Sequence, residues 1–127
     1  MSIIENMNMI SFNNPTLHAP SAVLEHELVP ADQSVAGDPT TGAERLGEFY
    51  GVEFGLWEMS AGIMTDVEAE ELFVVLSGSA TVQIHEANGF TADVLQLEPG
   101  TVCRLSEGMR TTWILDAPLR KLYLTQA

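Results

Sequence analysis

The stretch Glu71-Leu-Phe-Val-Val-Leu-Ser-Gly78 contains five consecutive apolar residues and ends in a Ser-Gly turn signal. Its β-branched and aromatic residues predict a strand over residues 71–76. Side chains alternate along a strand, so Glu71, Phe73 and Val75 share one face and the intervening residues share the other. Because both faces are largely apolar, both need to be covered. The stretch therefore indicates a strand built into a closed β-structure.

Short apolar segments continue on both sides of this strand, separated by turn signals roughly every ten residues. Asn88-Gly89 is a strong signal for a two-residue hairpin turn. The chain shows no helical period of normal length and no internal repeat, so the pattern favours an all-β fold. Strands in such an array need to close on themselves to hide their edges, as a jelly-roll barrel does. We expect strands at residues 52–59, 71–76, 80–85, 94–97, 102–105, 111–115 and 120–125.

The first part of the chain has a different character. Residues 1–43 are rich in Asn, Pro, Ser, Thr and Ala and show no sustained period, and the alternating pattern begins near Glu44. We expect an irregular N-terminal arm over residues 1–40, with one or two short strands, one of them near residues 23–28. A barrel domain is expected over residues 41–127.

Composition limits the partners of the chain. It has 127 residues, 46% of them hydrophobic, and a formal net charge of −13, which fits one domain with one core. This negative charge repels phosphate backbones and anionic lipid, so we expect neither nucleic acid nor membrane as a partner. No apolar run is long enough to span a bilayer, the first residues do not form a secretory leader, and Cys103 is the only cysteine. These features predict a cytoplasmic protein.

Two segments match the paired motifs of cupins. Glu71 to Gly78 reproduces the second half of the first motif, and Gly100, five residues and Ser106-Glu107-Gly108 follow the second, with Ser in place of Pro. The chain resembles small RmlC-like cupins of the (S)-ureidoglycine aminohydrolase-like branch. The resemblance implies a cupin double-stranded β-helix, which is a jelly-roll barrel, and barrels of that family commonly pair into dimers. Further matching segments are residues 55–62, Pro99-Gly100, Thr112-Trp113 and Arg120-Lys121.

The resemblance also implies a metal site, which this chain does not reproduce. Metal-binding cupins supply two His and a Glu from the first motif and one His from the second, and imidazole suits Fe, Mn, Ni and Zn. Here Thr111 occupies the second-motif His position, and His18, His26 and His85 lie elsewhere. We therefore expect no metal and no cofactor.

The first motif admits two registers. In the first register, side-chain alternation is carried back from Glu71 along the strand. It predicts that Thr65 and Val67 point into the barrel and that Glu68 and Glu70 point outward. Counting forward from the first glycine of the motif places those two glutamates on the His positions instead. We adopt the first count because it follows a strand period, whereas the second crosses a turn. It predicts a ligand site in the barrel mouth, lined by Val67, Glu71, Phe73, Thr111 and Trp113.

Four carboxylates lie within six residues at the start of the central strand. They fit a site for a hard cation, a pair of acid and base, or a solvated acidic rim. Glu71 begins an apolar strand that points inward, so its carboxylate needs a partner or a proton. Arg104 and Arg110 are the partners that we expect. The cluster consists of Asp66, Glu68, Glu70 and Glu71.

Three functions fit these patterns. The barrel pattern without its histidines favours a module that binds a small metabolite. The resemblance implies, as an alternative, an enzyme that acts on a small polar metabolite, as in the ureidoglycine aminohydrolase-like cupins. A partner-binding role of the acidic surface is the third.

The apolar outer stripe of the strand at residues 71–76 predicts a homodimer. Leu72, Val74 and Leu76 would face water in a single barrel, so the N-terminal arm or a second subunit has to cover them. Sedimentation velocity at micromolar concentration should report twice the chain mass of 13.8 kDa. A monomeric mass under these conditions would contradict the prediction.

Overall fold

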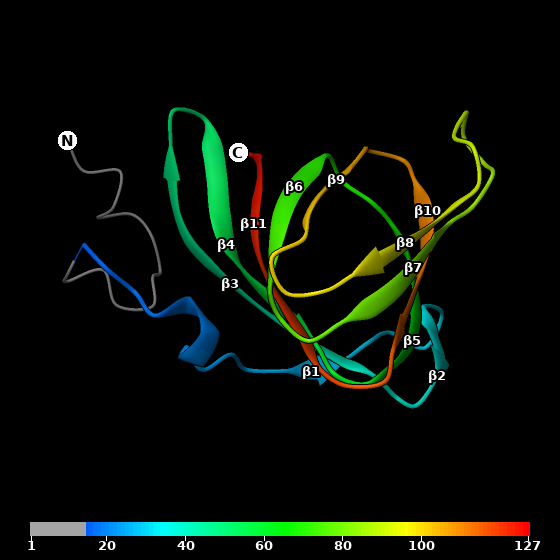
Figure 1. The fold of residues 1–127 in the computed structure, drawn as a ribbon, viewed down its shortest axis with the longest axis horizontal. Helices are drawn as coiled ribbons and strands as arrows, with labels where there is room; N and C mark the ends of the chain where they lie inside the picture. Colours follow the sequence, from blue (N-terminus) through cyan, green and yellow to red (C-terminus); the bar gives the residue numbers. More distant parts are fainter. Residues whose placement is uncertain (1–14) are drawn as a thin grey trace.

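The computed structural model describes residues 15–127, which form two antiparallel β-sheets that face each other (Figure 1). One sheet has the strand order β1-β3-β4-β11-β6-β9 and the other β2-β5-β10-β7-β8. Neighbours along the chain repeatedly lie in different sheets, so the expected all-β jelly-roll barrel is confirmed. The elements are η2 (Ala19–Ser21), β1 (Glu27–Leu28), β2 (Ser34–Ala36), β3 (Thr40–Phe49), β4 (Val52–Met59), β5 (Gly62–Val67), β6 (Glu71–Ser77), β7 (Ala80–Ile84), β8 (Asp93–Leu97), β9 (Val102–Leu105), β10 (Arg110–Leu115) and β11 (Leu119–Gln126).

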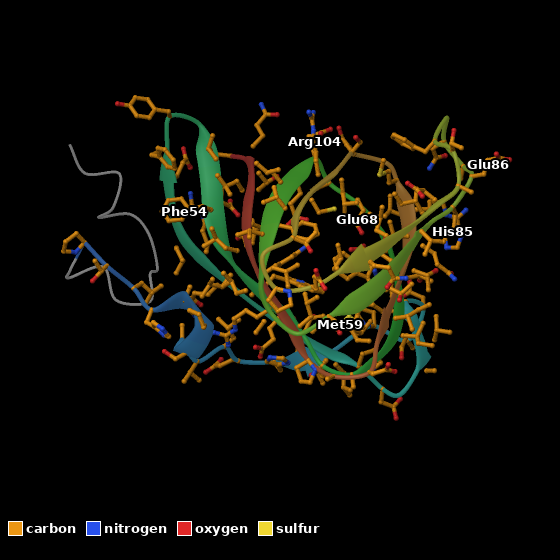
Figure 2. The ribbon with its side chains drawn as sticks, in the orientation of Figure 1. Phe54, Met59, Glu68, His85, Glu86 and Arg104 are labelled. Carbon is orange, nitrogen blue, oxygen red and sulfur yellow. The ribbon has the colours of Figure 1, made fainter. Side chains whose placement is uncertain are left out.

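The core lies between the two sheets, and β6 contributes Phe73 and Val75 to it. Phe73 and Val75 are each 1% exposed, which confirms the face predicted from their spacing. Figure 2 shows Met59 deep between the sheets and Glu68 nearer the end of the barrel where β6 begins. The inner faces bury Met59, Met64, Phe73, Val75, Val82, Ile84, Leu97, Leu105, Trp113, Leu115 and Leu119 in one cluster.

The outer face of β6 is only partly covered within one chain. Val74 and Leu76 are half-buried, and the short helix η2 contacts this strand. Leu72 is 44% exposed, and Val102 on the neighbouring β9 is also exposed. The homodimer therefore stays a prediction, with an apolar surface that a second copy would cover.

No helix within residues 15–127 is long and apolar enough to cross a lipid bilayer.

The strands over residues 52–59 and 102–105 begin and end as expected, and the others differ by a few residues at most. Asn88 and Gly89 both have positive φ, as the predicted hairpin turn requires. Strands β3 and β5 were not expected. Glycines and charged residues interrupt the apolar alternation of β3, which lowers its strand signal. Pairing with β1 and β4 nevertheless runs along the strand, with one register shift between Arg45 and Gly47.

The arm is fixed to the outer side of the first sheet by a buried charge network. Arg120 donates to Glu58 Oε2 at 2.9 Å and to the carbonyl oxygens of Ala19 and Ala22. Glu58 also contacts His26 Nε2 at 2.7 Å. Partial burial opposes its ionisation, but the hydrogen bonds from Arg120 and His26 hold the pKa of Glu58 below its usual value. This single carboxylate thus connects the arm to β4 and β11.

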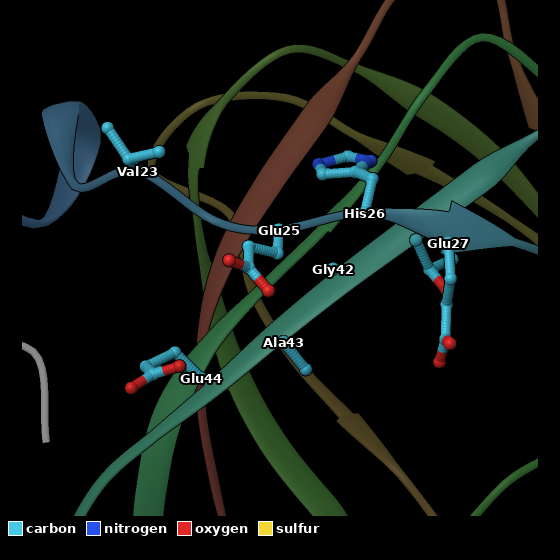
Figure 3. Close-up of a pocket in the computed structure, with 8 residues that line it drawn as sticks. Val23, Glu25, His26, Glu27, Gly42, Ala43 and Glu44 are labelled. Atoms are coloured by element: carbon cyan, nitrogen blue, oxygen red, sulfur yellow. The ribbon is translucent and has the colours of Figure 1, made fainter. Parts of the chain in front are cut away.

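The arm also crosses β3 at close range, beside a surface groove of about 620 Å³ (Figure 3). A Cβ atom at Gly42 would lie 2.5 Å from the carbonyl oxygen of Glu25, so only glycine permits the approach. Glu25, Glu27 and Glu44 line the groove together with His26, whose ring nitrogens contact Thr40 and Glu58. The groove is the seam between arm and barrel, and it lies on the outer face of the sheet.

Replacing Arg120 by Met should loosen the arm. The substitution leaves two carbonyl oxygens without their donor and removes the buried partner of Glu58, and such losses cost about 3 kcal/mol. Chemical unfolding should report this loss, and limited proteolysis should cleave faster within residues 15–36. Arg110→Met is the control, because the Arg110 side chain is exposed. Equal cleavage rates in the two variants would show that Arg120 does not hold the arm.

Candidate functional site

A cavity of about 320 Å³ lies between the two sheets. It is at the end of the barrel where β4 and β6 begin and β5 and β11 end, which is the upper edge in Figure 1. We call it the mouth pocket. Both sheets contribute: Trp57, Glu71 and Lys121 come from the first and Asp66 and Trp113 from the second. Its lining residues are Ala43, Glu53, Trp57, Asp66, Val67, Glu68, Ala69, Glu71, Trp113, Lys121, Tyr123 and Thr125.

Glu68 is the most constrained carboxylate of the mouth pocket. The residue is 7% exposed, and its Oε2 accepts hydrogen bonds from Thr111 Oγ1 at 2.6 Å and Trp113 Nε1 at 3.1 Å. Its backbone N–H donates to the Met109 carbonyl at 2.8 Å, and its own carbonyl accepts from the Gly108 N–H at 2.9 Å. The loop between β5 and β6 is thereby tied to the turn before β10. Glu68 is held in one orientation, and within residues 15–127 its Oε1 accepts no hydrogen bond.

The burial of Glu68 corrects the adopted register, in which Val67 pointed inward and Glu68 outward. Val67 is 62% exposed and lies at the rim of the pocket. The alternation fails because β5 ends at Val67 and residues 68–70 form a loop, so a strand period cannot be carried back from Glu71. The alternative count, forward from the first motif glycine, had placed Glu68 on a ligand position. Glu70 does point outward and pairs with Arg104 at 2.9 Å.

Lys121 enters the mouth pocket from β11 and is the only lysine in the sequence. Its side chain is 5% exposed, and its Nζ lies 2.9 Å from Glu71 Oε2. The same Nζ is 4.3 Å from the ring centre of Phe73, 4.6 Å from that of Trp57 and 5.0 Å from that of Trp113. Three aromatic rings and one carboxylate therefore surround a buried positive charge.

The partner of Glu71 is thus Lys121, and the expectation of Arg104 or Arg110 was wrong. Arg104 forms an ion pair with Glu70 on the outer surface, and the Arg110 side chain is exposed. Strands β6 and β11 are hydrogen-bonded neighbours, which brings the lysine side chain within reach of Glu71. No local sequence pattern indicated this pairing, because the two residues lie fifty positions apart.

The other ionisable groups of the mouth pocket differ in their partners and in the direction of their pKa shifts. Burial, together with the nearby charge of Glu68, raises the pKa of Asp66 to about 6. Glu53 accepts a hydrogen bond from the Tyr123 hydroxyl at 3.0 Å and pairs with Arg45. Burial and this carboxylate raise the pKa of the Tyr123 hydroxyl far above its usual value. Asp66 and Glu68 are therefore the two acids of the pocket without a basic partner.

Cys103 lies on β9, half-buried against the core. Burial raises the pKa of its thiol, so the thiolate is disfavoured. This environment fits an unreactive thiol.

The structure brings most of the predicted ligand residues together. Glu71 and Trp113 line the pocket, Phe73 forms part of the aromatic wall around Lys121, and Thr111 holds Glu68. Val67 contributes only at the rim. Ligand binding by these five residues stays a prediction. The sequence interpretation missed the inward position of Glu68 and the role of Lys121.

The residues at this position do not fit the metal ion of metal-binding cupins. Within residues 15–127, no three His, Cys, Asp or Glu side chains converge in a way that could hold a metal ion. The Glu71 carboxylate already contacts the Lys121 ammonium, whose charge would repel a cation. His85, the histidine nearest the second motif, instead contacts Thr112 Oγ1 at 2.7 Å.

The comparison with known families agrees with this architecture. Residues 46–123, more than half of the chain, match the EutQ-like cupin domain. The chain belongs to the EutQ-like cupin family. The finer placement in the ureidoglycine aminohydrolase-like branch is not shown by this match. No curated protein matches this EutQ-like cupin.

Solved structures share the fold of this EutQ-like cupin at low sequence identity. EutQ of Clostridium difficile is 14% identical with a TM-score of 0.62, covering 87% of this chain and 85% of its own. A protein of unknown function from Pseudomonas syringae pv. tomato is 15% identical with a TM-score of 0.66, covering 82% of this chain and 44% of its own. A putative ethanolamine utilization protein from Salmonella typhimurium is 13% identical with a TM-score of 0.57, covering 83% of this chain and 98% of its own.

Asp66→Asn should change how stability depends on pH. The raised pKa means that folding favours the protonated acid, so this contribution is present at low pH and is lost as pH rises through about 6. Asparagine stays neutral and still accepts the bond from the Val67 N–H. The variant should therefore gain melting temperature over the wild type at pH 7.5, and this gain should shrink at pH 5.

Asp93→Asn is the matched control for this experiment. Asp93 accepts the same local bond, from the Val94 N–H at 2.8 Å, but lies exposed on β8. Its variant should follow the wild type at both pH values. An Asp66 variant that also tracks the wild type between pH 5 and 7.5 would rule out the raised pKa.

Proposed function

We propose that this EutQ-like cupin binds a small polar metabolite in the mouth pocket, through a hydroxyl or ammonium group that donates to Glu68. The observation that carries the proposal is the orientation of this buried carboxylate. Thr111 and Trp113 both donate to Oε2, which leaves Oε1 to accept from a ligand. A carboxylate fixed in this way loses little entropy on binding.

The charges of the pocket support a donor ligand over an anionic one. Lys121 neutralises Glu71, and Arg45 pairs with Glu53. Asp66 and Glu68 are left without a cation, so the net field favours a neutral or positively charged ligand. The volume of about 320 Å³ lies at the small end of ligand pockets, which span about 300–1,000 Å³.

The names of the relatives suggest a first test compound. The Salmonella typhimurium neighbour is described as a putative ethanolamine utilization protein, and ethanolamine carries both an ammonium and a hydroxyl donor. The alternative function, an enzyme of the ureidoglycine aminohydrolase-like type, rests on the sequence motifs alone. Both readings place a small molecule rich in hydrogen-bond donors in the same pocket.

Glu68→Gln tests the proposal directly. Gln retains an oxygen that accepts from Thr111 and Trp113, but an NH₂ group replaces the free Oε1, and it cannot accept a bond from the ligand. Ethanolamine at millimolar concentration should raise the melting temperature of the wild type. The affinity of the variant, measured by calorimetry, should be at least about tenfold weaker, since one hydrogen bond to a charged group contributes about 1.5–3 kcal/mol.

Glu70→Gln is the control, because this neighbouring glutamate faces outward and should leave affinity unchanged. Glycolate, an anion of similar size, should not stabilise the wild type. Equal affinities for wild type and Glu68→Gln would remove Glu68 from the site. Stabilisation by glycolate but not by ethanolamine would show that the charge argument is wrong.

A further inference from the structure

The position of Lys121 is unusual for its residue type. Lysine is among the residues least often buried, because its ammonium group loses hydration inside a protein. This chain has a single lysine, and it lies inside the barrel at the wall of the mouth pocket. Its four arginines include none in the pocket. The only side-chain primary amine of the sequence thus lies where a small molecule would meet it.

We propose that the Lys121 amino group captures the carbonyl group of a small aldehyde or ketone as a protonated imine. The inference rests on the proposed function, because it concerns the same pocket and adds a second contact to the same ligand. The ligand class becomes a small hydroxy-carbonyl or amino-carbonyl compound, whose donor reaches Glu68 while its carbonyl carbon meets Nζ.

The surroundings of Nζ suit this product. The ammonium is stabilised by Glu71 at 2.9 Å and by the faces of Trp57, Phe73 and Trp113. A protonated imine carries the same single positive charge on the same nitrogen, and it is flatter than an ammonium. The carboxylate and the aromatic rings therefore stabilise the product as they stabilise the free lysine. Arginine would supply the charge but not the nucleophile.

Glu71 provides the proton transfers that the reaction needs. The ammonium gives one proton to the Glu71 carboxylate, and the freed lone pair forms the C–N bond while the carbonyl π bond opens. Proton transfer from nitrogen to oxygen then gives a carbinolamine. Glu71 returns its proton to the hydroxyl group, water leaves, and the nitrogen lone pair forms the C=N bond. Ammonium and carbonyl become protonated imine and water, and Glu71 ends as a carboxylate.

Reductive trapping of the full chain tests this step. Glycolaldehyde with cyanoborohydride at pH 7 should add one hydroxyethyl group, and peptide mapping should place it on Lys121. The rate should exceed that of the amide of Nα-acetyl-lysine by at least about tenfold, because proton transfer to a positioned base accelerates such reactions. A buried lysine with only a structural role would react more slowly than the free compound, and that result would overturn the proposal.

Variants separate the roles of the two residues. Lys121→Arg keeps the charge and should leave only the slow background at the N-terminal amine. Glu71→Gln should slow trapping at Lys121 by about tenfold or more, since no base remains beside Nζ. Should either variant fail to fold, the wild-type rate and the mapped position still decide the result. Rapid trapping at the N-terminal amine instead of Lys121 would likewise contradict the inference.

The same assay distinguishes failure of this inference from failure of the proposed function. Absence of an adduct, together with stabilisation by ethanolamine that depends on Glu68, would remove the imine and keep the binding site. An adduct at Lys121 that forms equally fast in Glu68→Gln would keep the imine and remove Glu68 as the ligand contact. In the wild type, acetaldehyde, which lacks the hydroxyl donor, should be trapped more slowly than glycolaldehyde. In Glu68→Gln, the two aldehydes should be trapped at equal rates.

Discussion

The contact between Lys121 and Glu71 imposes the strongest physical constraint on this barrel. The buried ammonium and the largely buried carboxylate both lose hydration, and only a close, well-oriented pair recovers that loss. At 2.9 Å, with three aromatic rings completing the shell, the pair meets this condition. The rings come from β4, β6 and β10, so the position of one charge depends on strands of both sheets.

The sequence predicted those parts of the fold that depend on local period and turn chemistry. The strand at residues 71–76, its inward residues and the Asn88-Gly89 turn follow from side-chain alternation and from backbone conformations that few residues adopt. The glycine-containing strand β3 was missed, because its stability comes from pairing on both sides and not from its own residues. Local propensity carries no information about partners distant in sequence.

The candidate site was predicted less well for a related reason. The strand period that located Phe73 does not continue through the loop at residues 68–70, so it gave the wrong orientation for Glu68. That orientation depends on hydrogen bonds to Thr111 and to the turn before β10, which lie about forty residues away in the chain. Thr111, at the second-motif position, donates a hydrogen bond to Glu68, and its part in ligand binding stays a prediction.

Strand β11 has one further consequence. Arg120 points outward and fixes the arm, and Lys121, the next residue, points inward to the pocket. Both are held by partly buried carboxylates, so a shift of this strand alters the two contacts together. To the extent that β11 moves as one body, occupancy of the pocket and attachment of the arm are thermodynamically linked. The factor by which a bound ligand changes the equilibrium of arm attachment then equals the factor by which arm attachment changes ligand affinity, so the state of the arm reports on what the barrel contains.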